Sequence, residues 1–205
     1  MAVKDREKID FVLAWVDGND PAWQKEFMKY RNPDADPEVS GAKRYRDWGN
    51  LHYWFRAVEK FAPWVNRVHL VTWGHIPEWL DTSHPKLNIV KHTDYIPAEY
   101  LPTFSANPIE LNFHRIEGLA EQFVYFNDDT FIGKPIPPER LFKKGLPRDN
   151  ARLFALRAEG LMGHIHVSDM EVINRHYRKS HVMRRLGKWF NFRYGLGDIF
   201  KTLTM

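Results

Sequence analysis

Two adjacent carboxylates, Asp128 and Asp129, follow the apolar run Phe123-Val124-Tyr125-Phe126, which is typical of a buried β-strand. In an open α/β sheet, ligands bind beyond the carboxyl ends of the strands. Carboxylate oxygens at that position suit Mg²⁺ or Mn²⁺ carrying a phosphate group. Asn and Asp also favour turns for purely local reasons, so this segment alone fits a turn as well as it fits a metal site.

A second apolar run, from Ile9 to Val16, ends in the same way, in the segment Asp17-Gly18-Asn19-Asp20. If the two runs form neighbouring strands of a parallel sheet, their carboxyl ends meet at one edge of that sheet. Side chains from both segments then line a single rim. This convergence favours the metal site over the turn, and we predict Asp128 and Asp129 as the metal ligands.

Arginines that could bind a phosphate precede a helix predicted from about Trp48 to Phe61. The guanidinium groups of Arg44 and Arg46 would lie beside the helix N-terminus, where forked donors and a partial positive charge favour a phosphate. The alternative is a surface arginine pair with Asp47 as the helix N-cap.

A carboxylate and an imidazole stand one turn apart on a second predicted helix, which begins at Asn107 as N-cap with Pro108 in its first turn. The buried stripe of this helix runs from Ile109 to Ala120, so Glu110 and His114 share another face. Glu110 could orient His114 as a general base. A surface ion pair has the same spacing, and Arg115 could instead bind phosphate while His114 only packs.

Strand-like and helix-like segments alternate along the first two thirds of the chain. Two further strands are predicted at residues 65–72 and 87–90. The pattern predicts an α/β fold with a mainly parallel sheet flanked by helices. We assign residues 1–145 to this core and residues 146–205 to a partial C-terminal region, in which Ser168 opens a helix rich in Arg and Lys.

The composition limits the kinds of partner and location. The chain has 205 residues, 43% of them hydrophobic, which is enough for one packed core. A net charge of +4 permits an anionic partner, but phosphorylated sugars satisfy it as well as nucleic acid does, and we predict no nucleic-acid partner. The lack of cysteine fits a reducing compartment. No export signal or membrane-spanning run of about 20 apolar residues is visible, so we expect a cytoplasmic protein with at most peripheral membrane association.

Several segments match the signature blocks of a known family. The stretch from Ile9 to Pro21 resembles the first block of the Stealth family. The second block is resembled by Arg44-Tyr45-Arg46-Asp47-Trp48-Gly49, Phe61-Ala62-Pro63-Trp64-Val65, Leu101-Pro102-Thr103-Phe104, Glu110, His114-Arg115-Ile116-Glu117-Gly118-Leu119 and Tyr125-Phe126-Asn127-Asp128-Asp129. The resemblance covers about residues 9 to 134 and is nearest to the bacterial capsular-polysaccharide branch. The third and fourth blocks of the family are not found before Met205, so we expect a chain truncated at its C-terminus.

The resemblance implies a nucleotide-sugar-transferase-like (GT-A or Rossmann-like) fold. It also implies an activity, the Mg²⁺- or Mn²⁺-assisted transfer of a sugar 1-phosphate from a nucleotide-sugar, most simply a UDP-sugar, to a hydroxyl of a growing capsular or exopolysaccharide. Such an enzyme would work at the inner face of the bacterial membrane. By analogy, the catalytic residues are Asp128, Asp129, His114 and Glu110. The nucleotide-sugar would contact Trp15, Val16, Asp17, Gly18, Asn19, Asp20, Arg44, Arg46, Asp47, Asn107 and Arg115.

Two other functions fit the same residues. A metal-dependent glycosyltransferase would use the same rim but release a nucleoside diphosphate, because attack falls on the anomeric carbon. A non-catalytic carbohydrate- or polyanion-binding module would use exposed aromatic rings and the basic C-terminal helix instead.

Overall fold

The computed structural model describes residues 8–32, 34, 45–148 and 160–178, together with the single residues 180, 181, 184, 187, 196, 197 and 200. The chain separates into two compact units, Met1–Pro147 and Arg148–Met205. The first unit contains the sheet and every candidate site residue. Arg44 lies outside the described residues, so its predicted role as a phosphate ligand stays a prediction.

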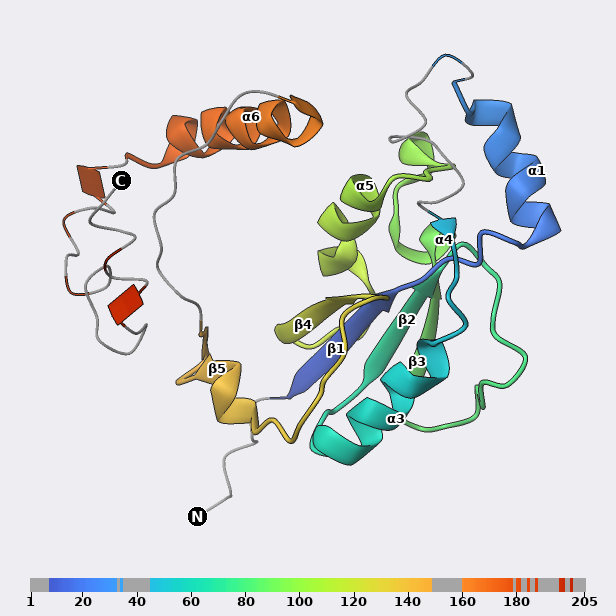
Figure 1. Cartoon of the computed structure of the whole chain (residues 1–205), viewed down its shortest axis with the longest axis horizontal. Coiled ribbons are helices and arrows are strands. Elements are labelled where there is room, and N and C mark those ends of the chain that lie inside the picture. The colour runs from blue at the N-terminus through green and yellow to red at the C-terminus, as the bar shows by residue number, and fades with distance from the viewer. Residues whose placement is uncertain are drawn as a thin grey trace. The chain divides into compact units, whose positions relative to one another are not determined.

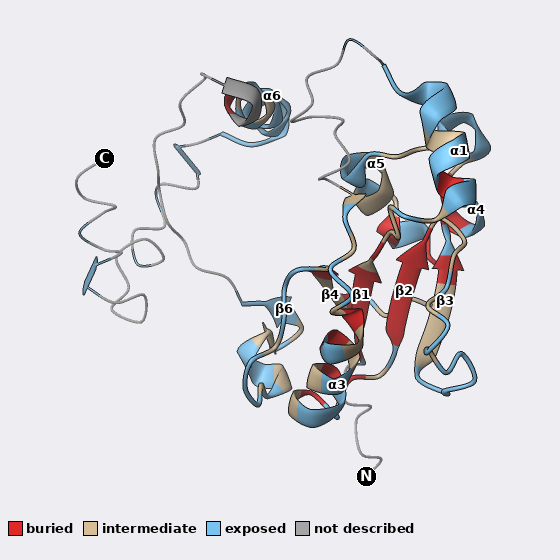
Figure 2. Cartoon of the chain, turned by 45° about the vertical axis from the view of Figure 1, so that its right-hand side comes forward, coloured by how far each residue is buried: buried red, intermediate tan, exposed pale blue. Residues whose placement is uncertain are grey.

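The first unit is built on a four-stranded parallel sheet with the order β3-β2-β1-β4 (Figure 1). Its strands are β1 (Ile9–Ala14), β2 (Val68–Thr72), β3 (Leu87–Lys91) and β4 (Gln122–Asn127). Strand β1 therefore lies between β2 and β4. It is buried along almost its whole length (Figure 2). This arrangement confirms the predicted α/β class with a parallel sheet and flanking helices.

Side chains of β1 alternate between two hydrophobic layers, as the pleat of a strand requires. Phe11 and Leu13 pack with Trp54 and Val58 of helix α3 (Leu51–Phe61) on one face. Val12 packs on the other face in a layer that includes the remaining core residues Val71, Val90, Tyr95, Ile96, Phe113 and Ile116. Each large apolar side chain that is fully buried in this way stabilises the folded state by about 1.5–3 kcal/mol relative to leaving it exposed.

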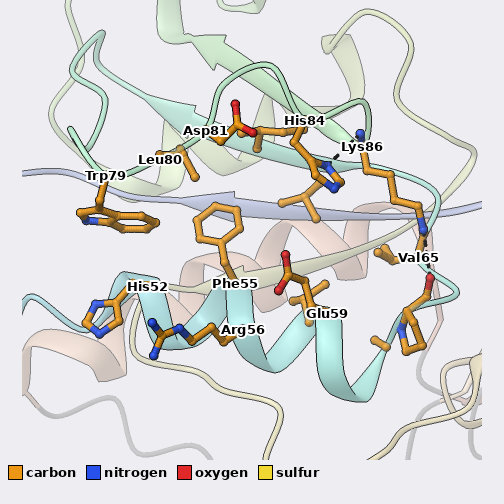
Figure 3. Close-up of a pocket in the computed structure, with 15 residues that line it drawn as sticks. His52, Phe55, Arg56, Glu59, Val65, Trp79, Leu80, Asp81, His84 and Lys86 are labelled. Atoms are coloured by element: carbon orange, nitrogen blue, oxygen red, sulfur yellow. Dashed lines mark hydrogen bonds between the residues drawn. The ribbon is translucent and has the colours of Figure 1, made fainter.

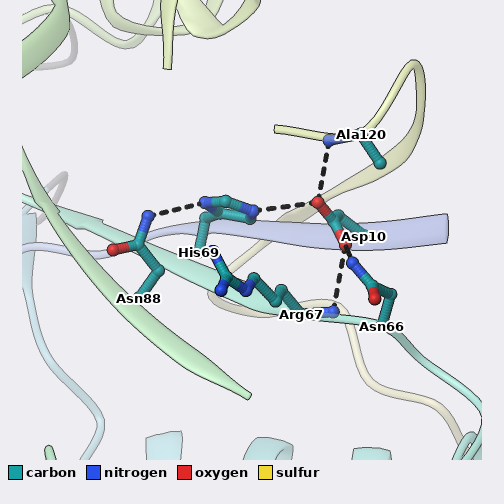
Figure 4. Close-up of polar contacts among 6 residues, drawn as sticks. All are labelled: Asp10, Asn66, Arg67, His69, Asn88 and Ala120. Carbon is teal, nitrogen blue, oxygen red and sulfur yellow. Dashed lines mark hydrogen bonds and ion pairs between the residues drawn. The ribbon is translucent and has the colours of Figure 1, made fainter. Parts of the chain in front are cut away.

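A buried carboxylate, Asp10, ties the amino ends of three strands together (Figure 4). Its Oδ1 accepts hydrogen bonds from Asn66 Nδ2 at 2.7 Å and from the Arg67 backbone N–H at 3.0 Å. Its Oδ2 accepts from the Ala120 backbone N–H at 2.8 Å and from His69 Nε2 at 3.0 Å. Asn88 on β3 donates to the other ring nitrogen of His69, so the imidazole carries its proton on Nε2. Both oxygens of the Asp10 carboxylate thus accept two hydrogen bonds each, at the amino ends of the strands and away from the rim.

Helix α1 (Pro21–Tyr30) is the next element along the chain after β1, which ends at Ala14. The Asp20 carboxylate accepts a hydrogen bond from the Trp23 backbone N–H at 2.7 Å, and Pro21 occupies the first helical position. The local signals in the sequence are sufficient here, because N-capping depends on neighbouring residues alone.

Helix α3 begins at Leu51, three residues after the predicted start at Trp48. Gly49 adopts a positive φ of 65°, in the left-handed region that favours glycine, and Asp47 Oδ1 accepts a hydrogen bond from the Gly49 backbone N–H at 3.1 Å. Asp47 therefore caps a turn, and the N-cap residue of the helix is Asn50. The alternative in which Asp47 is the N-cap of this helix is therefore wrong.

The helix predicted from Asn107 to about Ala120 forms only over its first part, so its predicted length and N-cap are wrong. The segment forms α5 (Ala106–Leu111), with Ser105 at the N-cap position, followed by the 3₁₀ turn η3 (Phe113–Arg115). Asn112 Nδ2 donates to the Pro108 carbonyl at 2.8 Å, and a side chain bonded to the backbone in this way competes with helix continuation. Asn107 consequently lies inside the first turn, and Glu110 and His114 do not share a helical face.

Short elements complete the first unit: α4 (His92–Tyr95), η2 (Ala98–Tyr100), η4 (Pro138–Arg140), and a two-stranded ribbon of β5 (Phe142–Lys143) and β6 (Leu146–Pro147).

The second unit contains α6 (Gly160–His176). The predicted helix start at Ser168 is wrong, because its Oγ–H donates to the His164 carbonyl at 2.9 Å, one turn back within a continuous helix. The basic residues Lys179, Arg185 and Lys188 lie outside the described residues. Among the helices that the structure describes, none combines the length and apolar character needed to cross a membrane.

Candidate active site at the carboxyl ends of β1 and β4

The register of the sheet brings the two acidic segments together. Ala14, the last residue of β1, pairs with Asn127, the last residue of β4. Trp15 and Val16 therefore leave the sheet beside Asp128 and Asp129. A cavity of about 180 Å³ opens at this rim, on the side of the sheet that carries α5, and it is lined by Trp15, Val16, Glu110 and Asp128, among others.

The segment that follows β1 is held by its own turn. The Asp17 carboxylate accepts from the Asn19 backbone N–H at 2.8 Å, and the Asp17 backbone N–H donates to His75 Nε2 at 2.9 Å. Burial lowers the pKa of His75, against the opposing effect of Asp20 and Asp17. Asp17 and Asp20 thus use their carboxylates in local turn and cap bonds, and neither lines the cavity.

Asp128 is half-buried and lies among other carboxylates. Burial raises the pKa of its carboxyl group, and the negative charges of Asp129 and Asp47 raise this pKa further. The folded protein by itself therefore stabilises the charged form of Asp128 less than water does. A cation or a hydrogen-bond donor bound at this point would oppose this effect and lower the pKa.

Glu110 faces the cavity and is held by a tyrosine. Its Oε1 lies 2.9 Å from the hydroxyl of Tyr125, which also lies within hydrogen-bond distance of Asn127 Oδ1 and can donate its one proton to either. Burial and the bond to Glu110 raise the pKa of Tyr125, so this hydroxyl stays protonated. The predicted partner of Glu110, His114, is exposed and instead donates from Nδ1 to the Leu111 carbonyl.

The remaining predicted ligands of a phosphate lie away from the cavity lining. The guanidinium of Arg46 stacks on the ring of Trp48, 4.2 Å from its centroid, and both side chains are exposed. Arg115 is exposed on η3, and Asn107 is exposed on α5. Gly18, Asn19 and Asp47 also lie outside the lining, as does Asp129, which is exposed next to Asp128.

Several lining residues were not predicted from the sequence. Trp23 on α1 packs against Tyr45 and Phe104, with ring centroids 4.9 Å and 5.8 Å away, and the three rings form an aromatic wall. Tyr45 and Phe104 stand within the family-like motifs, which was the one signal that could have identified them. His92 is an isolated residue in the sequence, and burial lowers its pKa to about 4, so its imidazole is neutral at physiological pH.

Two lining residues have buried polar atoms whose hydrogen bonds are not satisfied by the part of the chain that the structure describes. These atoms are Trp15 Nε1 and His92 Nδ1. Buried polar groups are nearly always paired, and an unpaired one costs about 1–3 kcal/mol. Their presence beside a cavity favours a binding role for this rim.

Within the described ranges, no three His, Asp or Glu side chains are grouped so that they could hold a metal ion. The oxygen donors of Asp128 and Asp129 nevertheless fit Mg²⁺ or Mn²⁺ in kind. Mg²⁺ usually keeps several waters and binds one or two carboxylates together with substrate phosphates, so two carboxylates are a sufficient protein contribution.

Comparison with known proteins decides the family. Residues 7–32 match the family model described as Stealth protein CR1, conserved region 1, and residues 44–149 match Stealth protein CR2, conserved region 2. The second match alone covers more than half of the chain. This chain belongs to the Stealth family.

Similar Stealth proteins come from streptococci. The chain is 48% identical over 198 residues to a capsular polysaccharide phosphotransferase, WcwK, of Streptococcus pneumoniae, and 46% identical over 200 residues to a receptor polysaccharide phosphotransferase, WefC, of Streptococcus oralis. Each alignment covers 96% of this chain and 60% of the relative, so the chain spans about three fifths of the length of these relatives. A capsular polysaccharide phosphotransferase, CpsJ, of Streptococcus thermophilus is 43% identical over 190 residues, with 91% of this chain and 80% of the relative covered.

In this Stealth protein, Gly18 permits the close approach of the segment that carries Tyr45. A Cβ atom at position 18 would overlap the Tyr45 carbonyl oxygen and lie 2.7 Å from its carbonyl carbon. We expect Gly18→Ala to lower the free energy of unfolding by about 1–3 kcal/mol, because a backbone carbonyl cannot move aside as a flexible side chain can. Urea denaturation measures this effect. Gly133→Ala is the matched control, since a Cβ there meets no atom within 4 Å. Equal stability of the two variants would contradict the packing role.

Proposed function

We propose that this protein transfers a sugar 1-phosphate from a nucleotide-sugar to a hydroxyl of a growing capsular or exopolysaccharide. The observation that carries the proposal is the position of Asp128. It lines a cavity with Trp15 and Val16, and burial and neighbouring carboxylates raise the pKa of its carboxyl group. It also lies in a conserved region of the Stealth family, and two proteins similar to this chain are named polysaccharide phosphotransferases. The most economical location for such an activity is the cytoplasm, at the inner face of the membrane.

The size of the cavity limits what it holds. Sites for whole small-molecule ligands usually measure about 300–1,000 Å³, whereas this cavity measures about 180 Å³. It can therefore accommodate one group of a donor such as a UDP-sugar, with the aromatic wall of Trp23, Tyr45 and Phe104 against a ring. The diphosphate would then lie along the rim, near Asp128 and Asp129.

In this proposal, Asp128 and Asp129 hold a divalent cation that neutralises charge on the diphosphate. The raised pKa of Asp128 supports the assignment, because a carboxylate that burial and its neighbours disfavour gains most from a bound cation. Arg46, with Arg44 or Arg115, is a candidate to balance the remaining phosphate charge once a donor is bound.

The reaction would be a phosphoryl-type transfer. An oxygen of the acceptor hydroxyl forms a bond to the sugar-proximal phosphorus, the bond from that phosphorus to the bridging oxygen breaks, and a nucleoside monophosphate leaves. The acceptor proton must go to a base. Glu110 is the better placed of the two predicted candidates, because its carboxylate lines the cavity while His114 is exposed. Tyr125 orients Glu110 through their hydrogen bond.

The identity of the released nucleotide tests this proposal. With a panel of UDP-sugars, Mg²⁺ and a polysaccharide acceptor, we expect release of uridine monophosphate, detected by anion-exchange chromatography. Release of the diphosphate would show attack on the anomeric carbon and would identify a glycosyltransferase instead. Calorimetry with the same donors provides a second readout, and absence of both turnover and donor binding would refute the proposal.

A further inference from the structure

A second hollow of the first unit lies on the opposite face of the sheet from the rim cavity. It is a groove of about 680 Å³ between helix α3 and the connection from β2 to β3. Figure 3 shows its two sides: His52, Phe55, Arg56 and Glu59 project from α3, and Trp79, Leu80, Asp81, His84 and Lys86 face them from the connection. The larger hollow therefore lacks the acidic rim residues, and the proposed transfer reaction leaves it without a role.

The groove is elongated. It follows α3 from His52 to Ala62, about 15 Å at the rise of an α-helix. Because α3 leads into β2 through a short connection, it runs antiparallel to that strand, and His52 marks the end of the groove nearer to the rim. The volume falls within the range of sites that bind whole ligands. A chain of linked rings fits this shape better than a single ring does.

Aromatic rings and short apolar side chains form the body of the groove. The Trp79 indole is 50% exposed, and its ring contacts Phe55 and His52 edge-on at centroid distances of 5.9 Å and 6.0 Å. Val58 and Val68 also line the groove, and both are buried. A half-exposed indole held in place by neighbouring rings is a rigid platform for the apolar face of another ring.

The charges of the groove are balanced. Two cations, Arg56 and Lys86, accompany two carboxylates, Glu59 and Asp81. Lys86 is already engaged, because its ammonium group donates to the Pro63 and Val65 carbonyls at 2.9 Å and 2.8 Å. Asp81 Oδ1 likewise accepts from the Ser83 backbone N–H at 2.9 Å and hydroxyl at 2.6 Å, so its Oδ2 is the oxygen offered to a ligand. The exposed carboxylates would repel phosphates, so a nucleotide or a polyanion is a poor occupant. Carboxylates do accept hydrogen bonds from hydroxyl groups.

We propose that this groove binds a segment of a neutral oligosaccharide, with a sugar ring on Trp79 and hydroxyl groups bonded to Glu59 and Asp81. The site is separate from the donor cavity and takes no part in the bond changes. It would hold a polysaccharide chain on the enzyme while the end of that chain reacts elsewhere. Only this last step, which makes the bound glycan the acceptor, rests on the proposed function.

Binding to the groove is tested by following the Trp79 indole N–H signal in NMR spectra during titration with maltotetraose, cellotetraose and tetra-N-acetylchitotetraose. The signal is assigned among the eight tryptophans by its loss in Trp79→Phe. We expect at least one of these neutral oligosaccharides to shift the signal saturably. Calorimetry should then show affinity weakened about tenfold or more in Trp79→Ala, because a stacking platform is lost.

Matched variants distinguish this site from the donor site. Tyr100→Ala removes an exposed aromatic ring from outside the groove and should leave the affinity unchanged, as should Asp128→Asn at the rim. Glu59→Gln provides a second variant within the groove, should Trp79→Ala fold poorly, and we expect a smaller loss of affinity.

The inference is overturned if none of the three oligosaccharides shifts the Trp79 signal, if binding survives Trp79→Ala unchanged, or if uridine monophosphate displaces the oligosaccharide. None of these results depends on whether the protein turns over a donor, so the two proposals fail separately.

Discussion

Asp10→Ala is expected to lower the free energy of unfolding by about 3–5 kcal/mol, because several buried donors lose their acceptor and each unsatisfied group costs about 1–3 kcal/mol. The substitution leaves His69, Asn66 and two backbone N–H groups, of Arg67 and Ala120, without their acceptor. Asp10 and His69 are both completely buried, so water cannot replace the lost carboxylate without opening the sheet. Urea denaturation monitored by circular dichroism at pH 7 measures the effect.

The control for this prediction is Asp94→Ala, which removes an exposed carboxylate that accepts a single backbone hydrogen bond from Lys91. We expect it to cost no more than about 1 kcal/mol, as is typical of a helix-capping side chain. If Asp10→Ala costs no more than Asp94→Ala, the buried network does not stabilise the sheet as described.

The same carboxylate makes stability depend on pH in a defined direction. Burial alone would raise the pKa of Asp10, but the hydrogen bonds from His69, Asn66 and Ala120 together hold this pKa below its ordinary value of 3.8. The stabilisation is therefore complete above the unfolded-state pKa and is lost as the pH falls through the lower folded-state pKa. Asp10→Asn, which cannot titrate, should lose less stability than the unmodified protein between pH 5 and pH 2.

Asp128→Asn is expected to reduce sugar-phosphate transfer at least a hundredfold while leaving the protein as stable as before or more stable. The loss of activity follows if the charge of Asp128 acts on the transition state, since removal of one such electrostatic group typically costs 10²–10³ in rate. The stability follows from the raised pKa of Asp128, which shows that burial and the charges of Asp129 and Asp47 oppose ionisation in the folded protein. An uncharged amide of the same shape relieves this repulsion.

Transfer rates and thermal unfolding of the same preparation test both parts. Glu121→Gln is the matched control, because Glu121 is exposed just before β4 begins, at the end of the sheet away from the rim. It should change neither property. An Asp128→Asn protein that keeps its activity would remove Asp128 from the proposed mechanism, and one that is clearly less stable would assign Asp128 a structural role.

Local sequence patterns were sufficient to predict the strands of the sheet. The strand at Phe123 and the strand at Ile9 are predicted from uninterrupted apolar runs, because strands covered on both faces need apolar side chains on both. Helix α1 begins at Pro21 behind the Asp20 cap, and both features act within one turn of the chain. Where a side chain competes with the backbone, as Asn112 does after α5, the periodicity of apolar residues gave the wrong helix length.

The motifs of the sequence also placed two acidic segments at one rim, on the condition that their strands are neighbours. The structure meets that condition through the pairing of Ala14 with Asn127. The structure did not bring Glu110 and His114 together. Their predicted pairing required one continuous helix through both residues, whereas α5 ends at Leu111. The catalytic and ligand roles of these residues stay predictions.

What the sequence determined by itself is the strands of the parallel sheet and the family signature, because apolar runs and contiguous motifs are properties of neighbouring residues. Only the tertiary structure decided which side chains share a cavity. His92 and Trp23 belong to the rim cavity, and Trp79 and Glu59 belong to the groove, although no pair among them is close in sequence. Asp10 likewise looked like any polar residue in an apolar run until its four donors, which come from distant segments, converged on it. Such convergence depends on strand order and register, and local sequence carries no direct record of either.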